Sequence, residues 1–394
     1  MLRKTLLFTL LAIWMFSFGC KTHPEPVKPA YDRPLPPGMH ALRKITDPAQ
    51  IPDFTVACTD LRDLPESIAN SLSYLGKPSS QGFFPSGEIS HDRTVESLET
   101  FLEMVESGLM GAQLNQAIRE KFDVYVSVGC DDQGTVLFTG YYTPIFEGSK
   151  ERTAQFNYPL YKQPGDLVKG PNGEILGRRT SDGQVIPYPQ RAVIEAAKML
   201  RGNELIWLGN AFEAYIAHVQ GSAKVRLPDG QLVTVGYAAN NGQEYRSVGE
   251  AMVKDGVIRS DQLSLSSMIE YFKANPDQVD TYTRRNPRFV FFREEQGEAR
   301  GSLNEEVTPM RTIATDKSIF PRAALGFIST ALPQMVGGQP VVQPYDGFVL
   351  DQDTGGAIRA PGRCDVYMGV GDTAGQLAGQ TYQEGRLYYL FVKE

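Results

Sequence analysis

The sequence is poor in the residues that build metal sites and disulfide frameworks. Only four cysteines and four histidines occur in 394 residues. No two cysteines have the close spacing of a structural zinc site, so we expect no metal centre. Cys58 and Cys130 could form a disulfide in an oxidising compartment, and the sequence does not decide between a bridge and free thiols. Cys364 has no histidine near it along the chain, which favours an inert thiol.

The chain also lacks an excess of positive charge. Its formal net charge is −7, and it becomes −9 once Arg3 and Lys4 are left out. A nucleic-acid partner would need a basic face, so this class of partner is not expected. Charged residues make up 22% and hydrophobic residues 41%, which is ordinary for a soluble globular protein. The length is sufficient for two domains, and no repeat of fixed period is present.

The first residues have the pattern of a secretion signal. Arg3 and Lys4 precede an apolar run from Leu6 to Phe18, which is too short to span a membrane comfortably. Small Gly19 before Cys20 resembles a bacterial lipobox, so we predict a signal peptide over residues 1–19 and a lipid on Cys20. Plain secretion with cleavage nearby is the alternative. Residues 20–40 are rich in proline, which predicts an extended tether.

Two carboxylates stand among glycines and strand-forming residues near the C-terminus. Asp353 precedes Gly355-Gly356, and Asp365 precedes Val366-Tyr367. Apolar surroundings disfavour the charged form of a carboxyl group, and a general acid at neutral pH must keep its proton. The residues alone leave two interpretations open, because aspartates of this kind also cap ordinary turns.

Further motifs decide between these interpretations. Together with Asp316, the two aspartates resemble the three aspartates of the 3D domain. Upstream motifs occur in the order found in the family of membrane-bound lytic transglycosylase A (MltA). They are Phe138-Thr139-Gly140-Tyr141-Tyr142-Thr143-Pro144, Val219-Gln220-Gly221-Ser222, Gly236-Tyr237-Ala238 with Asn241-Gly242, Tyr245-Arg246-Ser247-Val248-Gly249, and Asn286-Pro287. The resemblance runs from about residue 136 to the C-terminus.

The resemblance implies a mainly β fold with some helix. It predicts a double-psi β-barrel catalytic domain formed by residues 41–148 and 294–394. A smaller, mainly β domain specific to the family is expected at residues 149–293, inserted into the barrel domain. The glycan would lie in a groove between the two domains.

The resemblance also implies the chemistry. The family cleaves the β-1,4 bond between N-acetylmuramic acid and N-acetylglucosamine of peptidoglycan and leaves a 1,6-anhydro end. Asp365 matches the single catalytic carboxyl group, first acid and then base, and no cofactor is needed. Asp353 and Asp316 are expected to support it. The predicted substrate contacts are Thr139, Tyr142, Gln220, Gly221, Ser222, Asn241, Gly242 and Tyr245.

Two other functions are compatible with the same residues. An endoglucanase-like hydrolase would use Asp353 and Asp365 as a pair, and a non-catalytic barrel would only bind glycan. The expected partners are glycan strands, a lipid anchor and the machinery of cell-wall synthesis or division. We expect the chain on the periplasmic face of the outer membrane, with a soluble periplasmic protein as the alternative.

Overall fold

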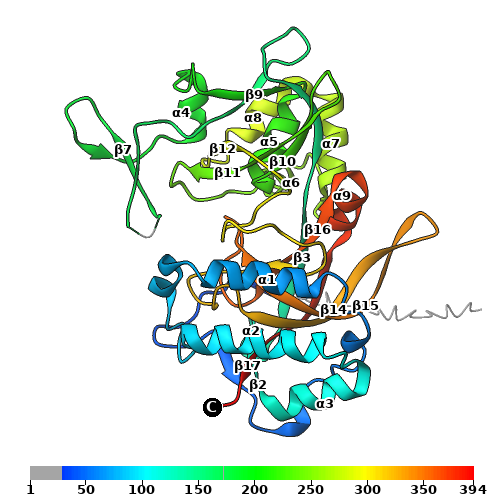
Figure 1. Ribbon diagram of the computed structural model, residues 1–394. Helices are drawn as coiled ribbons and strands as arrows, with labels where there is room; N and C mark the ends of the chain where they lie inside the picture. The colour runs from blue at the N-terminus through cyan, green and yellow to red at the C-terminus, as the bar shows by residue number, and fades with distance from the viewer. Residues whose placement is uncertain (1–28, 172) are drawn as a thin grey trace, which may run out of the picture.

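The computed structural model describes residues 29–171 and 173–394. Two bodies lie one above the other in Figure 1, and the chain crosses from the lower body to the upper one and back. The lower body contains the C-terminus and is built from the N-terminal and C-terminal parts of the chain. The predicted signal peptide, Cys20 and residues 21–28 of the predicted tether lie outside the described residues.

The lower body is a closed β-barrel. Within the described residues the hydrogen-bonded order is β1-β2-β17-β14-β15-β13-β16-β3, and β17 also pairs with β3. This pairing closes a ring that runs from β17 through β14, β15, β13 and β16 to β3, and β2 and β1 extend the sheet from β17. The prediction of a mainly β fold with a closed barrel is therefore confirmed. Its strands are β1 (Leu42–Lys44), β2 (Phe122–Ser127), β3 (Val136–Thr143), β13 (Thr312–Ala314), β14 (Leu325–Val336), β15 (Gln339–Asp353), β16 (Arg363–Val370) and β17 (Tyr382–Val392).

Side chains that alternate along these strands fill the barrel and cover its outer surface. One face contributes Phe138, Val366 and Tyr389 to the core. The other face packs Phe327 and Phe348 against the N-terminal helices, which lie along one side of the barrel in Figure 1. The helical segments of this body are η1 (Pro48–Gln50), η2 (Ala57–Thr59), α1 (Leu64–Leu75), η3 (Pro78–Phe83), α2 (His91–Glu106), α3 (Gly111–Lys121) and α9 (Gly371–Gln380).

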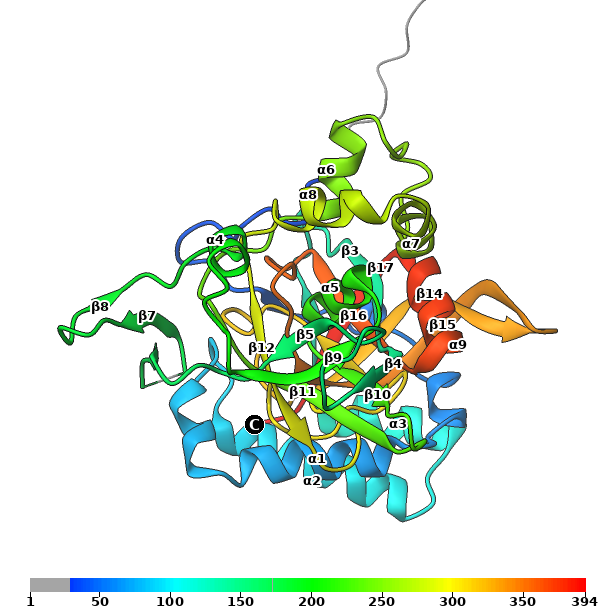
Figure 2. The ribbon, with the colours of Figure 1, turned by 90° about the horizontal axis from the view of Figure 1, so that it is seen from above.

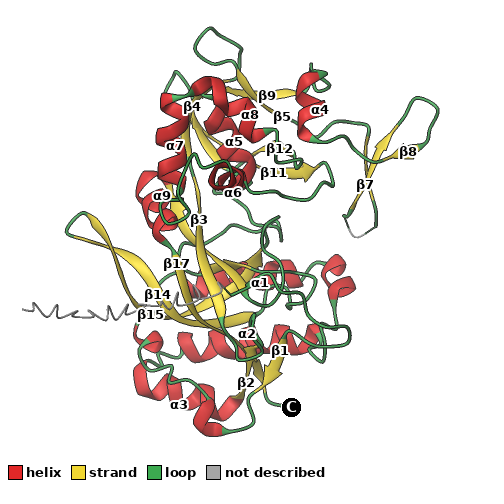
Figure 3. Cartoon of the chain, turned by 180° about the vertical axis from the view of Figure 1, so that it is seen from behind, coloured by secondary structure: helices red, strands yellow, loops and turns green. Residues whose placement is uncertain are grey.

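The upper body combines sheets with helices. Its six-stranded sheet has the order β12-β11-β10-β4-β9-β5, and β6, β7 and β8 form a separate small sheet that extends to one side in Figure 2. Figure 3 shows helices packed beside the larger sheet. The elements are β4 (Ile145–Ser149), β5 (Tyr158–Tyr161), β6 (Leu167–Lys169), β7 (Ile175–Arg179), β8 (Val185–Ile186), α4 (Arg191–Ala196), β9 (Glu204–Leu208), α5 (Ala211–Gln220), β10 (Ala223–Arg226), β11 (Leu232–Asn240), α6 (Val248–Lys254), α7 (Leu265–Ala274), η4 (Pro276–Gln278), α8 (Val279–Thr283) and β12 (Val290–Glu295).

The change from one body to the other lies close to a proline. β3 ends at Thr143 in the barrel, and β4 begins at Ile145 beside β10 in the upper sheet. Pro144 separates them, and it cannot donate a backbone N–H to continue the ladder of β3. Judged by strand pairing, the upper body begins at Ile145. This is four residues before residue 149, where the inserted domain was predicted to begin. On the return, β12 pairs with β11 as far as Glu295.

The three cysteines that the structure describes form no disulfide. Cys58, Cys130 and Cys364 are all buried and free, so the Cys58–Cys130 bridge that the sequence left open is not formed. Burial raises the pKa of the Cys58 thiol to about 12 and that of the Cys364 thiol well above its usual range. A thiol held protonated is a poor nucleophile, so the interpretation of Cys364 as inert is supported. Among the described helices, none has the length and hydropathy needed to cross a bilayer.

Candidate active site

Asp365 lies in β16, between two neighbouring strands of the barrel wall. Its backbone pairs with Thr139 of β3 on one side and with Ala314 of β13 on the other. The Thr139 hydroxyl donates to Oδ1 of Asp365. Oδ2 has no hydrogen-bond donor among the residues that the structure describes, and 18% of the side chain is exposed. The carboxyl group is therefore anchored through one oxygen, and the other oxygen remains available to a ligand.

Arg363 lies two residues before Asp365 on the same strand, so the two side chains share a face. Its Nη2 is 3.5 Å from Oδ1 of Asp365 and 3.4 Å from the Thr139 hydroxyl oxygen. Its Nε is buried without a hydrogen-bond partner. Arg363 was not among the predicted site residues, although its spacing of two residues from Asp365 within a strand places both side chains on one face.

Asp353 ends β15 and is held more firmly than Asp365. Its Oδ1 accepts the backbone N–H groups of Ser302 and Thr354, each at 2.8 Å. Its Oδ2 accepts the Tyr141 hydroxyl at 2.9 Å. Burial raises the pKa of this carboxyl group, while the three hydrogen bonds oppose that rise. The arrangement fixes the position of Asp353 and occupies most of its acceptor capacity.

Asp316 organises a turn. It accepts the N–H and hydroxyl of Ser318 at 3.1 and 2.6 Å and the N–H of Ala360 at 3.1 Å. It thereby joins the segment after β13 to the segment before β16. This position agrees with a supporting role, because it fixes the approach to the strand that carries Asp365.

The two consecutive tyrosines of β3 face opposite ways. Tyr141 is on the same face as Thr139 and reaches Asp353, whereas Tyr142 belongs to the hydrophobic core with 8% of its surface exposed. Burial raises the pKa of Tyr142 to about 12. The Tyr142 ring therefore offers little surface to a sugar. Tyr141, which the sequence analysis did not choose, lies next to the aspartates.

The predicted Gln220-Gly221-Ser222 motif lies at the C-terminus of α5 and meets the end of β3. Oε1 of Gln220 accepts the Tyr142 backbone N–H at 3.2 Å. Gly221 has φ +80°, a conformation that favours glycine and ends the helix. The Ser222 hydroxyl oxygen is 3.4 Å from that of Thr143. This motif thus connects the upper body to the barrel strand that carries Thr139.

The other predicted contacts lie in the upper body. Asn241 is buried and donates to the carbonyl groups of Pro189 and Pro287 at 2.8 and 2.9 Å, so its side chain joins two chain segments. Gly242 follows with φ +71°. Burial raises the pKa of the Tyr245 hydroxyl well above its usual value. These contacts give Asn241 a structural role, whether or not glycan passes near it.

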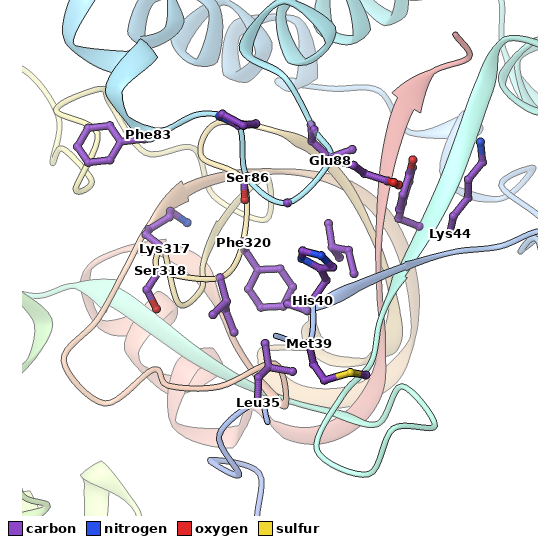
Figure 4. Close-up of a pocket in the computed structure, with 17 residues that line it drawn as sticks. Leu35, Met39, His40, Lys44, Phe83, Ser86, Glu88, Lys317, Ser318 and Phe320 are labelled. Atoms are coloured by element: carbon purple, nitrogen blue, oxygen red, sulfur yellow. The ribbon is translucent and has the colours of Figure 1, made fainter. Parts of the chain in front are cut away.

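A cavity of about 470 Å³ lies elsewhere in the barrel body. Figure 4 shows Met39, His40, Phe320 and Lys317 around it. None of the predicted site residues lines it. Lys317 also forms a buried ion pair with Asp351, and Asp351 accepts the hydroxyl of Tyr389 at 2.7 Å. No cluster of residues that could hold a metal ion occurs in the part of the chain that the structure describes.

Known protein families match both bodies. The MltA specific insert domain matches residues 137–293, and the 3D domain matches residues 311–391. A closed barrel of the 3D type that carries this insert defines the class of protein. The chain belongs to the MltA family.

Relatives support this assignment over most of the chain. Membrane-bound lytic murein transglycosylase A of Escherichia coli K12 is 26% identical over 337 residues, which cover 83% of this chain and 86% of that protein. The protein of the same name from Vibrio cholerae is 29% identical and covers 66% and 67%.

Solved structures show the same fold. A membrane-bound lytic murein transglycosylase from Agrobacterium tumefaciens superposes with a TM-score of 0.74 at 25% identity, covering 89% of this chain and 98% of that one. E. coli MltA with bound chitohexaose gives a TM-score of 0.65 at 23% identity, covering 84% and 90%. The likeness extends through both bodies.

Proposed function

We propose that this protein is a peptidoglycan lytic transglycosylase in which Asp365 is the single catalytic acid and base. The observation that carries the proposal is the asymmetry of the Asp365 carboxyl group. Oδ1 is held by Thr139 and lies near Arg363, and Oδ2 is without a donor from the described residues. One oxygen can thus be positioned while the other exchanges a proton with the substrate.

The reaction conserves all atoms of the glycan. Protonated Asp365 donates to the oxygen that bridges C1 of N-acetylmuramic acid and C4 of N-acetylglucosamine, and the C1–O bond breaks. The N-acetylglucosamine part leaves with a free 4-hydroxyl. The Asp365 carboxylate then accepts the proton of the muramic acid 6-hydroxyl as that oxygen bonds to C1. No water enters, and Asp365 ends the cycle protonated as it began.

The supporting residues position this group and its strand. Asp353 is held by two backbone N–H groups and Tyr141. Thr139 contacts Asp365 directly, and Gln220, Gly221 and Ser222 stabilise the adjoining end of β3. We retain Asn241, Gly242 and Tyr245 as proposed contacts for more distant sugars. When the substrate's own hydroxyl attacks C1, the enzyme has mainly to orient that hydroxyl, and these rigidly held residues can do so.

The hydrolase alternative is weakened by the contacts of Asp353. A second catalytic carboxylate would have to activate water or attack C1, which requires a free oxygen lone pair. Both acceptor positions of Oδ1 and one of Oδ2 are already used by protein donors. Asp353 is better suited to a structural role than to a second chemical one.

Product mass tests the function directly. Purified peptidoglycan is digested with the protein, and the released muropeptides are weighed. We expect products that lack one water relative to hydrolysis products, because the muramic acid end closes on itself. Products that carry the additional water would support the hydrolase, and the absence of any turnover would support the non-catalytic barrel.

We further propose that the protein is anchored to the periplasmic face of the outer membrane by a lipid on Cys20. The names of the E. coli and V. cholerae relatives call those proteins membrane-bound. The lipobox-like sequence before Cys20 supplies the chemistry of attachment. Mass spectrometry of the N-terminal peptide would detect the lipid, and an unmodified Cys20 would favour the soluble periplasmic alternative. Contacts with cell-wall synthesis or division machinery stay a prediction.

A further inference from the structure

The strands β14 and β15 extend beyond the barrel as a two-stranded arm, formed by residues 331–344 (Figures 1 and 2). They pair with each other along their whole length, as far as Val336 with Gln339. Pairing with the other barrel strands ends earlier, because β17 reaches only to Ser329. The arm is therefore supported from one end: Leu332 and Pro333 at its base are buried against the body, and the part from Gln334 to Val342 projects from it.

The arm is unusually apolar for an exposed element. No charged residue occurs from Ala323 to Tyr345, although 22% of the chain is charged. Met335, Val336, Val341 and Val342 are exposed to 38%, 49%, 41% and 41% of their surface. Exposed apolar side chains gathered on a projecting element indicate a contact surface for a protein or a membrane.

The strand register separates two faces. One face carries only apolar residues, because Ala331 pairs with Pro344, Pro333 with Val342, and Met335 with Pro340. The other face alternates apolar residues with amides: Leu332 pairs with Gln343, Gln334 with Val341, and Val336 with Gln339. A surface that is apolar on one side and uncharged but polar on the other matches the interfacial region of a bilayer.

The prolines argue against a partner that adds a strand. Pro333, Pro340 and Pro344 have no N–H to donate. An extended peptide or a second copy of the arm would need an uninterrupted row of such donors along one edge. Contact through side chains is therefore favoured over contact through the backbone.

The start of the described chain lies at the base of the arm. The Tyr31 hydroxyl donates to Glu384 of β17, and the backbone carbonyl of Glu384 accepts the hydroxyl of Thr330, the residue before the arm. From Cys20 to Tyr31 an extended chain can reach about 35 Å, and the arm from Ala331 to Val336 is about 20 Å long. A lipid on Cys20 can thus lie in the same plane as the tip of the arm.

From these observations we infer that the arm is a second membrane contact, which places its apolar face in the interfacial region of the bilayer that holds the Cys20 lipid. This inference rests on the proposed anchor. The arm would set the orientation of the barrel relative to the membrane, since attachment at a single point leaves the barrel free to rotate about that point. Because the arm is uncharged, its membrane contact should depend little on salt.

The test places an environment-sensitive fluorophore at Pro340→Cys, on the apolar face near the tip of the arm, in the full-length chain. Labelling is selective because Cys58, Cys130 and Cys364 are buried. The lipidated protein is reconstituted in vesicles of phosphatidylethanolamine and phosphatidylglycerol. In a parallel sample a histidine tag replaces residues 1–20 and attaches the protein to nickel-chelating lipid, so that the arm is measured without Cys20 and its lipid. We expect a blue shift and quenching by brominated acyl chains in both samples, at low and high salt.

Matched variants test the face. Met335→Glu with Val342→Glu adds two charges to the apolar face, and Gln334→Glu with Gln343→Glu adds two to the other. The first pair should reduce quenching about tenfold, and the second much less, because the apolar face lies deeper. Glycan turnover in detergent solution should be unchanged in both, which separates the arm from the proposed chemistry. Two results would overturn the inference. The first is quenching of the arm probe no stronger than that of a probe at Leu176→Cys in β7. The second is an arm probe that is already shielded from water when no vesicles are present.

Discussion

Asp353 and Asp365 flank the same residue of the barrel but are held by different kinds of groups. The backbone of Ala314 in β13 pairs with Asp353 on one side and with Asp365 on the other. Asp353 receives two backbone N–H groups and a buried phenol. Asp365 is contacted by two side chains, Thr139 and Arg363, through one oxygen only.

The difference explains why we propose Asp365, and not the more deeply buried Asp353, as the reacting group. The pKa of Asp353 is raised by burial, a property often found in catalytic acids. Backbone donors cannot move aside, however, so this carboxyl group has little freedom to exchange protons with a substrate. Asp365 is partly exposed and retains one oxygen without a protein donor, which is the more useful condition for acid–base chemistry.

Replacing Asp365 should have the largest effect on turnover. Asp365→Asn keeps the shape and the contact with Thr139 but removes the titrating proton. We expect release of anhydro-muropeptides to fall by about 10³-fold or more, because one group supplies both proton transfers. Thermal denaturation and glycan binding should be close to wild type. Turnover within tenfold of wild type would transfer the chemistry to another group.

Replacing Arg363 should have the second largest effect on turnover. Its Nη2 lies 3.5 Å from Oδ1 of Asp365, so it can orient the carboxyl group and interact with the charge that develops there during proton transfer. Arg363→Met should therefore lower kcat by about 10- to 100-fold with a much smaller change in KM. Arg363→Lys keeps the charge and should restore much of kcat. A kcat unchanged in Arg363→Met would limit this residue to packing.

Asp353→Asn should reduce activity less, by about tenfold, and should change the pH dependence of stability. Burial favours the protonated form of Asp353 in the folded state, so its folded pKa lies above its unfolded value. The stability that this group contributes is fully present below the unfolded pKa and is lost as pH rises through the folded pKa. The Asn side chain of Asp353→Asn does not ionise, so the variant does not lose this stability as pH rises.

Unfolding in denaturant, measured between acidic and neutral pH, checks that result. The stability of Asp353→Asn relative to wild type should increase with pH, and Asp365→Asn, on the other side of β13, provides the matched control. A difference that stays constant with pH would mean that the hydrogen bonds of Asp353 fully offset its burial.

Several features of the site followed from the sequence because they depend on local chemistry. Asp365 precedes strand-forming residues and lies near the start of β16. Gly221 follows an amphipathic helix and ends it with positive φ. Each of these depends on residues close together in the chain.

What the sequence analysis missed depends on which face of a strand is buried. It selected both Thr139 and Tyr142, which have opposite parity in β3 and cannot share a face. The alternation places Tyr141 with Thr139, but only the long-range pairing of β3 with β16 and β17 shows which face meets the aspartates. Asn241 was missed as a structural residue for a similar reason, since its partners Pro189 and Pro287 are distant in the chain.

The two tyrosines of β3 offer the smallest and most discriminating change. Tyr141→Phe removes one of the three donors to Asp353 and leaves an acceptor short of one hydrogen bond, which is worth about 1 kcal/mol. We expect turnover to fall about threefold to fivefold with little loss of stability. Tyr142→Phe, one residue along and buried in the core, should leave turnover unchanged. Steady-state rates on purified peptidoglycan distinguish them, and a larger loss in Tyr142→Phe would mean that the sugar meets the strand from its other face.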